Sequence, residues 1–213
     1  MTNNHTIVIG NVLRADIRGF VVASRIPEPE VPTFGTFVRA PIQQGQTDLI
    51  GIVHNIRLQD DPFLRTLAAT IAPDDPQYAE VIQDQRENRA LPVEISVAAI
   101  GYRIAGRGSF IYGFPPQPPM VLYSIAVCSD QEVEAITASP EFMRTLLDAP
   151  DLPTDELIPA ALERAAALRP ASEVEHFLVD SGRYLARYLG RDPVRLDRIL
   201  RRLESLYTAA RAT

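Results

Sequence analysis

The chain has 213 residues, 46% of them hydrophobic and 23% charged, which is enough for one large domain or two small ones with real cores and excludes an intrinsically disordered protein. The net charge is −6, and every one of the 21 basic residues is an arginine. Residues 1–171 carry 21 acids and 13 arginines, whereas residues 172–213 carry 6 acids and 8 arginines. The main part of the chain should therefore repel nucleic acid, and only the C-terminal segment could attract it.

Cysteine content and hydropathy indicate the compartment. The chain has a single cysteine, Cys128, so it forms no intramolecular disulfide, as is usual in a reducing cytoplasm. The first five residues lack the basic region of a signal peptide, and no apolar run reaches the roughly 20 residues that span a membrane. We therefore expect a soluble, cytoplasmic protein with no membrane contact.

The first 58 residues have the pattern of strands. Short β-branched segments are separated by turn residues, and the predicted strands are 6–13, 17–24, 35–40 and 48–58. Gly10 lies inside the first of these strands, where it indicates a bulge or a close backbone approach. The proline-rich segment 26–32 cannot be a central strand, because proline has no N–H to donate. This close spacing is typical of a small antiparallel barrel or sandwich.

The middle of the chain changes period and then returns to strands. Residues 61–71 and 76–88 have helical spacing, which predicts a helical insertion at about 61–88. Strand character returns at 92–105, which ends in a turn over 105–110, and again at 120–127. The chain thus contains six predicted strands.

Only helices are predicted after Cys128. Their N-termini are indicated by capping boxes at Ser129 with Glu132 and Ser172 with Glu175, and by the capping residues Thr154 and Asp192. The predicted fold class is α+β: a small six-stranded antiparallel β-barrel with a helical insertion, residues 1–128, followed by an all-α C-terminal tail, residues 129–213.

The order of these strands resembles a known family. The segments that carry the likeness are Gly10-Asn11-Val12, Phe20-Val21-Val22, Gly35-Thr36-Phe37-Val38, Ile50-Gly51-Ile52-Val53, Ala98-Ala99-Ile100-Gly101-Tyr102 and Pro115-Pro116-Gln117-Pro118-Pro119-Met120-Val121. Together they resemble the HAS barrel, the domain shared by HerA-type DNA translocases and the ATP-synthase catalytic core. The resemblance covers roughly residues 6–127. It implies a barrel that mediates assembly and the docking of partners.

The ATPase activity of HerA-type proteins does not follow from this resemblance. Their phosphate-binding loop requires a lysine after its second glycine, and this chain contains no lysine. The glycine-rich segment 106–109 lies between two predicted strands, opens no helix and is interpreted as a hairpin turn. The chain is therefore expected to be a stand-alone form of the barrel that lacks the ATPase domain.

No residue pattern predicts a catalytic, metal or cofactor site. Cys128 ends an apolar strand with no neighbouring base to form a thiolate. His176 follows Glu173 at a Glu-x-x-His spacing, but a di-iron site requires two such motifs. We predict no catalytic residue, no metal ligand and no cofactor, and hence a protein that is not an enzyme.

The last helix carries the one candidate contact site. Arg191, Arg195, Arg198 and Arg202 are spaced four, three and four residues apart and share one face, which Arg183 and Arg187 extend into the preceding helix. These arginines could contact phosphates or an acidic protein surface. The alternative is a solvated face balanced by pairs such as Asp197 with Arg201.

Three functional hypotheses follow. The leading one is a non-enzymatic interaction or assembly module that docks with a HerA-type DNA translocase or nuclease in DNA processing, or that self-associates through barrel edges. The second is a nucleic-acid-binding protein that uses the barrel or the C-terminal arginine helix. The third is an enzyme whose site is assembled from distant residues.

Overall fold

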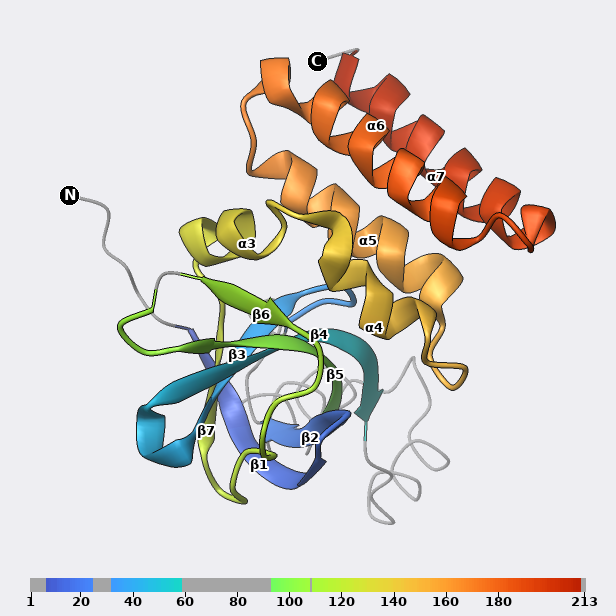
Figure 1. Ribbon diagram of the computed structural model, residues 1–213. Coiled ribbons are helices and arrows are strands. Elements are labelled where there is room, and N and C mark those ends of the chain that lie inside the picture. The colour runs from blue at the N-terminus through green and yellow to red at the C-terminus, as the bar shows by residue number, and fades with distance from the viewer. Residues whose placement is uncertain (1–6, 25–31, 59–92, 108, 212–213) are drawn as a thin grey trace, which may run out of the picture.

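The computed structural model describes residues 7–24, 32–58, 93–107 and 109–211 (Figure 1). The helical insertion predicted at 61–88 lies outside these residues, and so does most of the proline-rich segment before residue 32. Within the described part of the chain, no helix is both long and apolar enough to cross a membrane.

Six antiparallel strands close into a barrel, which confirms the predicted fold class. The strands are β1 (Val8–Asp16), β2 (Gly19–Ser24), β3 (Phe37–Ile42), β4 (Thr47–Leu58), β5 (Val93–Ile104) and β7 (Ser124–Val127). Around the barrel they follow the order β1-β7-β3-β4-β5-β2, and the pairing of β2 with β1 closes the circle. A short 3-10 helix, η1 (Gln43–Gly45), joins β3 to β4.

Two glycines allow neighbouring strands to approach closely. The register of β1 against β7 shifts between Val8 and Gly10, as predicted, and a Cβ on Gly10 would lie 2.1 Å from the carbonyl oxygen of Ala23. On β4, a Cβ on Gly51 would lie 2.8 Å from the carbonyl oxygen of Ala98. Any larger residue at either position would push the strands apart.

A short seventh strand, β6 (Phe110–Tyr112), was not predicted. It pairs antiparallel with the end of β5 alone, from Gly101 opposite Tyr112 to Arg103 opposite Phe110. The prediction of a turn over 105–110 was correct for Gly106, whose φ of 76° lies in the left-handed region, but wrong at Phe110. Three residues are too few for a two-residue period to be recognised.

The long strands β4 and β5 are buried on both faces over residues 49–53 and 97–101. Leu49, Val53 and Val97 point into the barrel, where they form one core with Ile9 and Val22 of the first two strands. The residues of β4 and β5 that point outwards, Ile50, Ile52, Ala98 and Ile100, belong to a second core shared with the helices. The strands therefore have apolar residues at successive positions, where one buried face would require every second residue.

The helices form two layers over one side of the barrel (Figure 1). Their bounds are α3 (Asp130–Ile136), the 3-10 helix η2 (Pro140–Met143), α4 (Arg144–Leu147), α5 (Thr154–Ala167), α6 (Ala171–Tyr188) and α7 (Pro193–Arg211). The first four lie next to the barrel, and α6 and α7 pack on α5 farther away. Phe142 of η2 contacts Phe37 of β3, with ring centroids 6.1 Å apart, so the two parts share a core.

The predicted capping box of α3 is confirmed. The Glu132 N–H donates to Ser129 Oγ at 3.3 Å, and the Ser129 N–H donates to Glu132 Oε2 at 2.9 Å. The start of α7 is also as predicted, because Asp192 Oδ1 accepts the N–H of Arg195 at 3.1 Å. Both helices begin where a side-chain oxygen satisfies an otherwise unpaired backbone donor.

Two other capping predictions were wrong. Helix α6 begins at Ala171 with Pro170 before it, so Ser172 lies inside the first turn and forms no capping box with Glu175. Helix α5 begins at Thr154 itself, with Pro153 in the capping position. The observed capping residue is a proline in both cases, two residues before the predicted cap in α6 and one residue before it in α5, and its fixed φ is compatible with a helix start.

Candidate functional site

The predicted arginine stripe lies against the N-terminal turn of α5. Arg195 Nε is 2.6 Å from Asp155 Oδ1, and its Nη2 donates to the hydroxyl of Thr154. Arg198 Nη1 is 2.9 Å from Asp155 Oδ2, so one carboxylate bridges two of the four arginines. This arrangement explains why Thr154 caps no helix: its oxygen accepts from α7 instead.

The other two arginines of the stripe differ from each other. Arg202 Nη2 pairs with Glu156 Oε2 at 3.2 Å, whereas Arg191 is exposed and makes no ion pair within the described residues. On another face of α7, Arg201 Nε pairs with Asp197 Oδ2 at 2.9 Å, as the alternative interpretation expected. Three of the four predicted contact arginines are thus balanced within the chain. Their contact with a partner stays a prediction.

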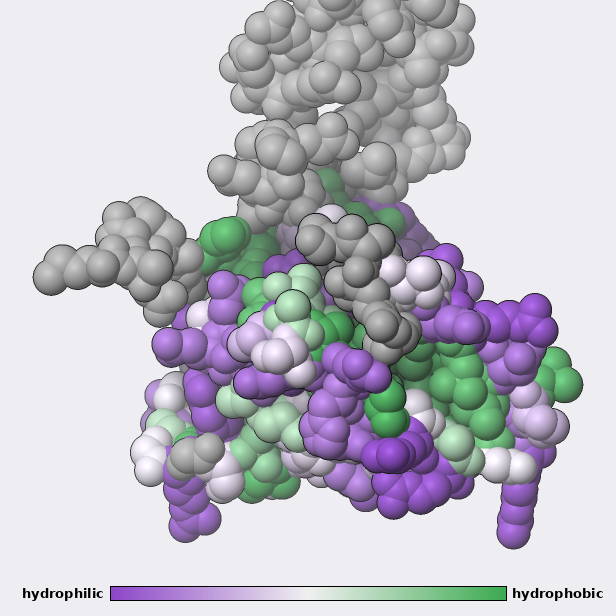
Figure 2. Space-filling view, turned by 90° about the horizontal axis from the view of Figure 1, so that it is seen from above, coloured by the Kyte–Doolittle hydropathy of each residue, from purple (hydrophilic) through white to green (hydrophobic). Residues whose placement is uncertain are grey.

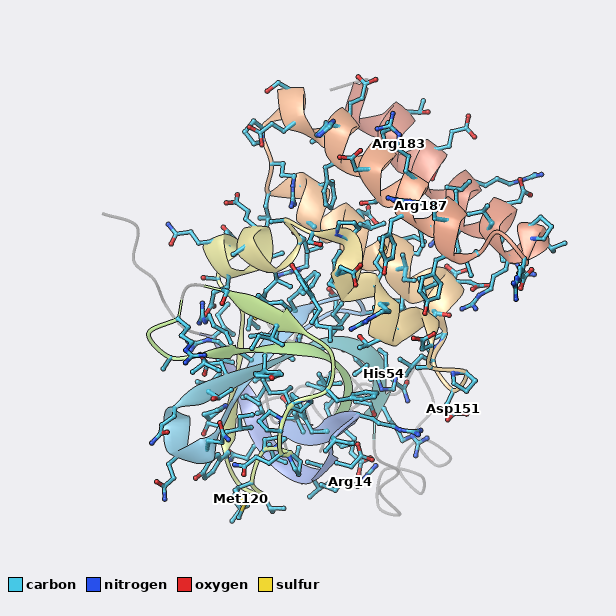
Figure 3. The ribbon with its side chains drawn as sticks, in the orientation of Figure 1. Arg14, His54, Met120, Asp151, Arg183 and Arg187 are labelled. Atoms are coloured by element: carbon cyan, nitrogen blue, oxygen red, sulfur yellow. The ribbon has the colours of Figure 1, made fainter. Side chains whose placement is uncertain are left out.

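The arginines of α6 lie on the outer face of the helical layer (Figure 3). Arg183 Nη1 pairs with Asp180 Oδ1 at 3.0 Å, and Arg187 Nε donates to the Arg183 carbonyl at 3.3 Å. Asp180 also pairs with His176, whose Nε2 is 3.1 Å from Asp180 Oδ2. Seen from above in Figure 2, this face is covered largely by hydrophilic side chains, with apolar ones between them.

A stacked pair of tyrosines lies on α6, and one of them, Tyr188, contacts the C-terminal end of α4. The rings of Tyr184 and Tyr188 are stacked, with centroids 6.0 Å apart, and the Tyr188 hydroxyl donates to Asp148 Oδ1 at 2.5 Å. This hydrogen bond to a carboxylate, together with burial, raises the pKa of Tyr188 to about 12. The phenol therefore stays protonated and keeps donating at physiological pH, which makes it a structural link.

Cys128 lies in an environment that disfavours the thiolate form. Cys128 is 5% exposed, and burial followed by the charge of Glu132 raises the pKa of its thiol far above the usual value. A protonated, buried thiol is a poor nucleophile. Among the described residues, no group of three or more histidine, cysteine, aspartate or glutamate side chains has a geometry that could hold a metal ion.

An ion-pair cluster connects α3 to the barrel beside this cysteine. Arg103 Nη2 donates to Glu132 Oε1 at 2.8 Å and to Asp48 Oδ2 at 3.2 Å, while Arg39 Nε lies 3.6 Å from Glu132 Oε2. Burial raises the pKa of the Glu132 carboxyl, but the Ser129 N–H and the two arginines outweigh burial, so this pKa lies below its usual value. The cluster fixes the orientation of α3 on β3, β4 and β5.

One arginine caps two helix C-termini at once. Arg169 Nη1 donates to the Ala165 carbonyl in the last turn of α5 at 2.5 Å, and Nη2 donates to the carbonyl and hydroxyl of Thr137 at the end of α3, at 3.2 and 2.8 Å. Its guanidinium also lies 3.8 Å from the ring centre of Phe177. A hollow of about 710 Å³ adjoins it, but these contacts explain Arg169 as a structural cation at the negative ends of two helices.

An exposed apolar turn occupies the end of the barrel that faces away from α6 and α7, where Met120 is labelled in Figure 3. Met120, Val121 and Leu122 are 61%, 55% and 76% exposed, and Leu13 of β1 beside them is 42% exposed. The Leu122 N–H donates to the Val12 carbonyl at 2.9 Å, which places the turn next to β1. We call these four residues, Leu13 and Met120–Leu122, the apolar tip.

The prediction of a strand over 120–127 was therefore too long. Strand β7 begins at Ser124, because Leu122 has a φ of 71°, which is outside the range of strands. The Tyr123 N–H turns back to the Met120 carbonyl at 3.2 Å. The run of large apolar residues 120–122 was predicted to be part of a strand, but it forms a turn that projects into solvent. The four prolines just before it were the available signal of a loop.

A hollow of about 680 Å³ lies between the barrel wall and the segment that joins α4 to α5. Its barrel side is lined by residues 14–16, 18–21 and 96–99, which include small residues such as Gly19 and Ser96 and the charged residues Arg14, Asp16 and Arg18. His54 and residues 148–152 also line it, and Figure 3 shows His54 and Asp151 on this side of the molecule. Burial lowers the pKa of His54, so its imidazole is neutral at physiological pH. The sequence did not predict this hollow.

The tip and the hollow have no residue in common. The tip is convex and uncharged, and the hollow is concave with charged residues, among them Arg18 and Asp151, along its lining. Intramolecular contacts explain neither of these two features of the described surface. Comparison of the chain with protein-family models and with curated proteins gave no match.

Proposed function

We propose that this protein is a non-enzymatic assembly module that binds another protein through the apolar tip. The observation that supports the proposal is the exposure of three consecutive large apolar side chains, Met120 to Leu122. Such a run is unfavourable in water and is typical of an interaction site. Full burial of one such side chain is worth about 1.5–3 kcal/mol.

The backbone of the tip supports the same proposal. Leu122 adopts a left-handed conformation, which costs an ordinary L-residue roughly 1–2 kcal/mol. With its side chain 76% exposed, Leu122 recovers little of that energy from packing inside the protein. A strained residue that presents an apolar side chain to solvent is better explained by a contact outside the chain than by folding.

Two properties of the loop that carries the tip, residues 113–123, favour binding. Residues 113–123 contain no charged side chain, so docking would remove no charge from water. Four of these residues are prolines, and Pro115 and Pro119 are buried against the rest of the protein. A loop already held in one conformation loses little entropy when it binds.

The resemblance to the HAS barrel suggests the setting of this assembly. The closed barrel has the fold that the resemblance implies, and the chain lacks the lysine that a phosphate-binding loop would need. We therefore expect the module to work beside a separate HerA-type DNA translocase or nuclease in DNA processing. Because Asp155 and Glu156 balance three arginines of α7, a protein partner is favoured over nucleic acid.

A pull-down of the tagged full chain from its native host tests this function. Leu122→Asp places a charge in the tip, and aspartate tolerates the left-handed backbone. Val194→Asp makes a comparable change at another exposed apolar residue, 71% exposed at the start of α7, and serves as the matched control. We expect a translocase or nuclease to be recovered with the wild-type and Val194→Asp proteins and lost with Leu122→Asp. Equal recovery with all three, or none with any, would reject the proposal.

A further inference from the structure

The proposed function makes no use of the 680 Å³ hollow between the barrel and the segment that joins α4 to α5. We propose that this hollow binds a small zwitterionic ligand, a free amino acid with an apolar side chain. The carboxylate of the ligand pairs with Arg18, and its ammonium group pairs with Asp151. This inference goes beyond the proposed function and does not depend on it.

Contacts within the chain already use three of the five charged residues that line the hollow. Arg14 Nη2 lies 3.4 Å from Glu94 Oε2. Asp16 Oδ1 accepts two backbone N–H groups of the turn between β1 and β2, at 2.7 and 3.1 Å. Asp148 accepts the hydroxyl proton of Tyr188. One cation and one anion of the lining are left to recognise a ligand.

These two remaining charges come from different walls of the hollow. Arg18 lies in the turn between β1 and β2, and Asp151 lies in the segment that joins α4 to α5. Both are exposed, and neither forms an ion pair within the described part of the chain. A ligand with a single charge would be attracted by one of them and repelled by the other. A zwitterion satisfies both, and the guanidinium of arginine matches a carboxylate well.

The rest of the lining is more apolar than polar. Val21 and Ala98 contribute side chains from the outer face of the barrel, and Phe114 and Leu152 add apolar surface from the neighbouring loops. Sites for small ligands typically combine an apolar lining with a few polar groups, within a volume of roughly 300–1,000 Å³. The hollow, at about 680 Å³, has this size and this composition, so it fits a ligand that carries an apolar side chain.

Uncharged polar groups in the lining also lack partners. The side chains of His54 and Ser96 form no hydrogen bond with another described residue, and neither does the buried hydroxyl of Thr145. Burial lowers the pKa of His54, so its imidazole adds no charge and offers one donor and one acceptor. Polar groups in such surroundings normally have partners. The hollow therefore has hydrogen-bonding capacity that the fold does not use.

Isothermal titration calorimetry of the purified full chain with free amino acids tests the inference. L-leucine and L-phenylalanine are the probes, because their apolar side chains match the lining, and glycine is the comparison. We expect at least one of the two to bind about tenfold more tightly than glycine. Its N-acetyl derivative lacks the ammonium group and its amide lacks the carboxylate. Each blocked form should bind about tenfold more weakly than the free amino acid.

Two substitutions assign the charges of the ligand to the walls of the hollow. Arg18→Gln should weaken binding of the free amino acid about tenfold and bind the amide equally well. Asp151→Asn should have the same effect for the N-acetyl derivative. Both residues are exposed, so both variants should fold as wild type does, as judged by circular dichroism. Arg191→Gln changes an exposed arginine outside the hollow and should bind as wild type does.

Three results would overturn the inference. These are no binding of either probe at millimolar concentration, blocked forms that bind as tightly as the free amino acid, and wild-type affinity in both Arg18→Gln and Asp151→Asn. None of them touches the apolar tip, which shares no residue with the hollow. Asp151→Asn should still recover the translocase or nuclease in the pull-down, so the failure of one proposal is distinguishable from the failure of the other.

Discussion

Replacement of Leu122 by asparagine should stabilise the protein while it weakens assembly. Leu122 is the residue at which the tip departs from ordinary backbone geometry, with a φ of 71° and a side chain 76% exposed. Asparagine tolerates the left-handed region better than leucine, because its short polar side chain bonds the local backbone. Folding should therefore improve at the position where binding is lost.

The size of the effect follows from two opposing terms. Relief of the left-handed conformation returns part of roughly 1–2 kcal/mol. Loss of the quarter of Leu122 that is packed removes about 0.5 kcal/mol, from the 1.5–3 kcal/mol that full burial is worth. We expect the free energy of unfolding to rise by about 0.5–1 kcal/mol, and the Tm to rise by about 1–4 °C for a chain of this length.

Urea unfolding followed by circular dichroism measures this change, since the chain contains no tryptophan. Repeating the measurement at several protein concentrations controls for self-association, which would stabilise the folded state through mass action. Val121→Asn is the matched control. Val121 is 55% exposed and its φ is not positive, so this change should lower the free energy of unfolding by about 1 kcal/mol. If Leu122→Asn destabilises the protein as much as Val121→Asn, Leu122 is packed and the strain argument is wrong.

Three further predictions concern the fold. Phe142→Ala leaves a cavity against Phe37 in the buried core and should lower the free energy of unfolding by about 3–5 kcal/mol. The barrel and the helices should still unfold in one urea transition, and a second transition would contradict the shared core. Arg169→Met removes hydrogen bonds to the ends of α5 and α3 and should lower the free energy of unfolding by about 1–3 kcal/mol. A decrease below about 0.5 kcal/mol would contradict the role of Arg169 as a helix cap. The pKa of Glu132 is lower in the folded than in the unfolded protein, so its ionised carboxylate stabilises the fold above the unfolded pKa, and this stability is lost as the pH falls through the folded pKa. Glu132→Gln should therefore make the free energy of unfolding depend less on pH in the acid range. An unchanged pH dependence would contradict the ion-pair account.

Local sequence patterns predicted most of the fold. The six barrel strands were predicted because β-branched apolar segments and the turn residues that separate them are recognised within a few residues of each other. The capping box of Ser129 with Glu132 was equally local, and it forms as predicted. The errors arose where a local signal was ambiguous: β6 was too short to recognise, and the apolar run at 120–122 has the composition of a strand but the geometry of a turn.

The candidate site could not be predicted in the same way. The spacing of the arginines placed them correctly on one face of α7, but their acidic partners lie about 40 residues earlier, on α5. No spacing rule connects Arg195 to Asp155, because α5 and α7 meet only when the helical layer is packed. The hollow was even less predictable from the sequence, since Gly19, Ser96 and residues 148–152, which line it, come from three distant parts of the chain.

The amino-acid sequence by itself determined the strands of the barrel, the helical character of the tail and the lack of a lysine for a phosphate-binding loop. These properties depend on residue type and on spacing within one or two turns of chain. The tertiary structure decided which arginines are neutralised, which apolar run is exposed and where a hollow opens beside the barrel. Those outcomes depend on which distant surfaces cover one another, and burial is a property of the packed molecule as a whole.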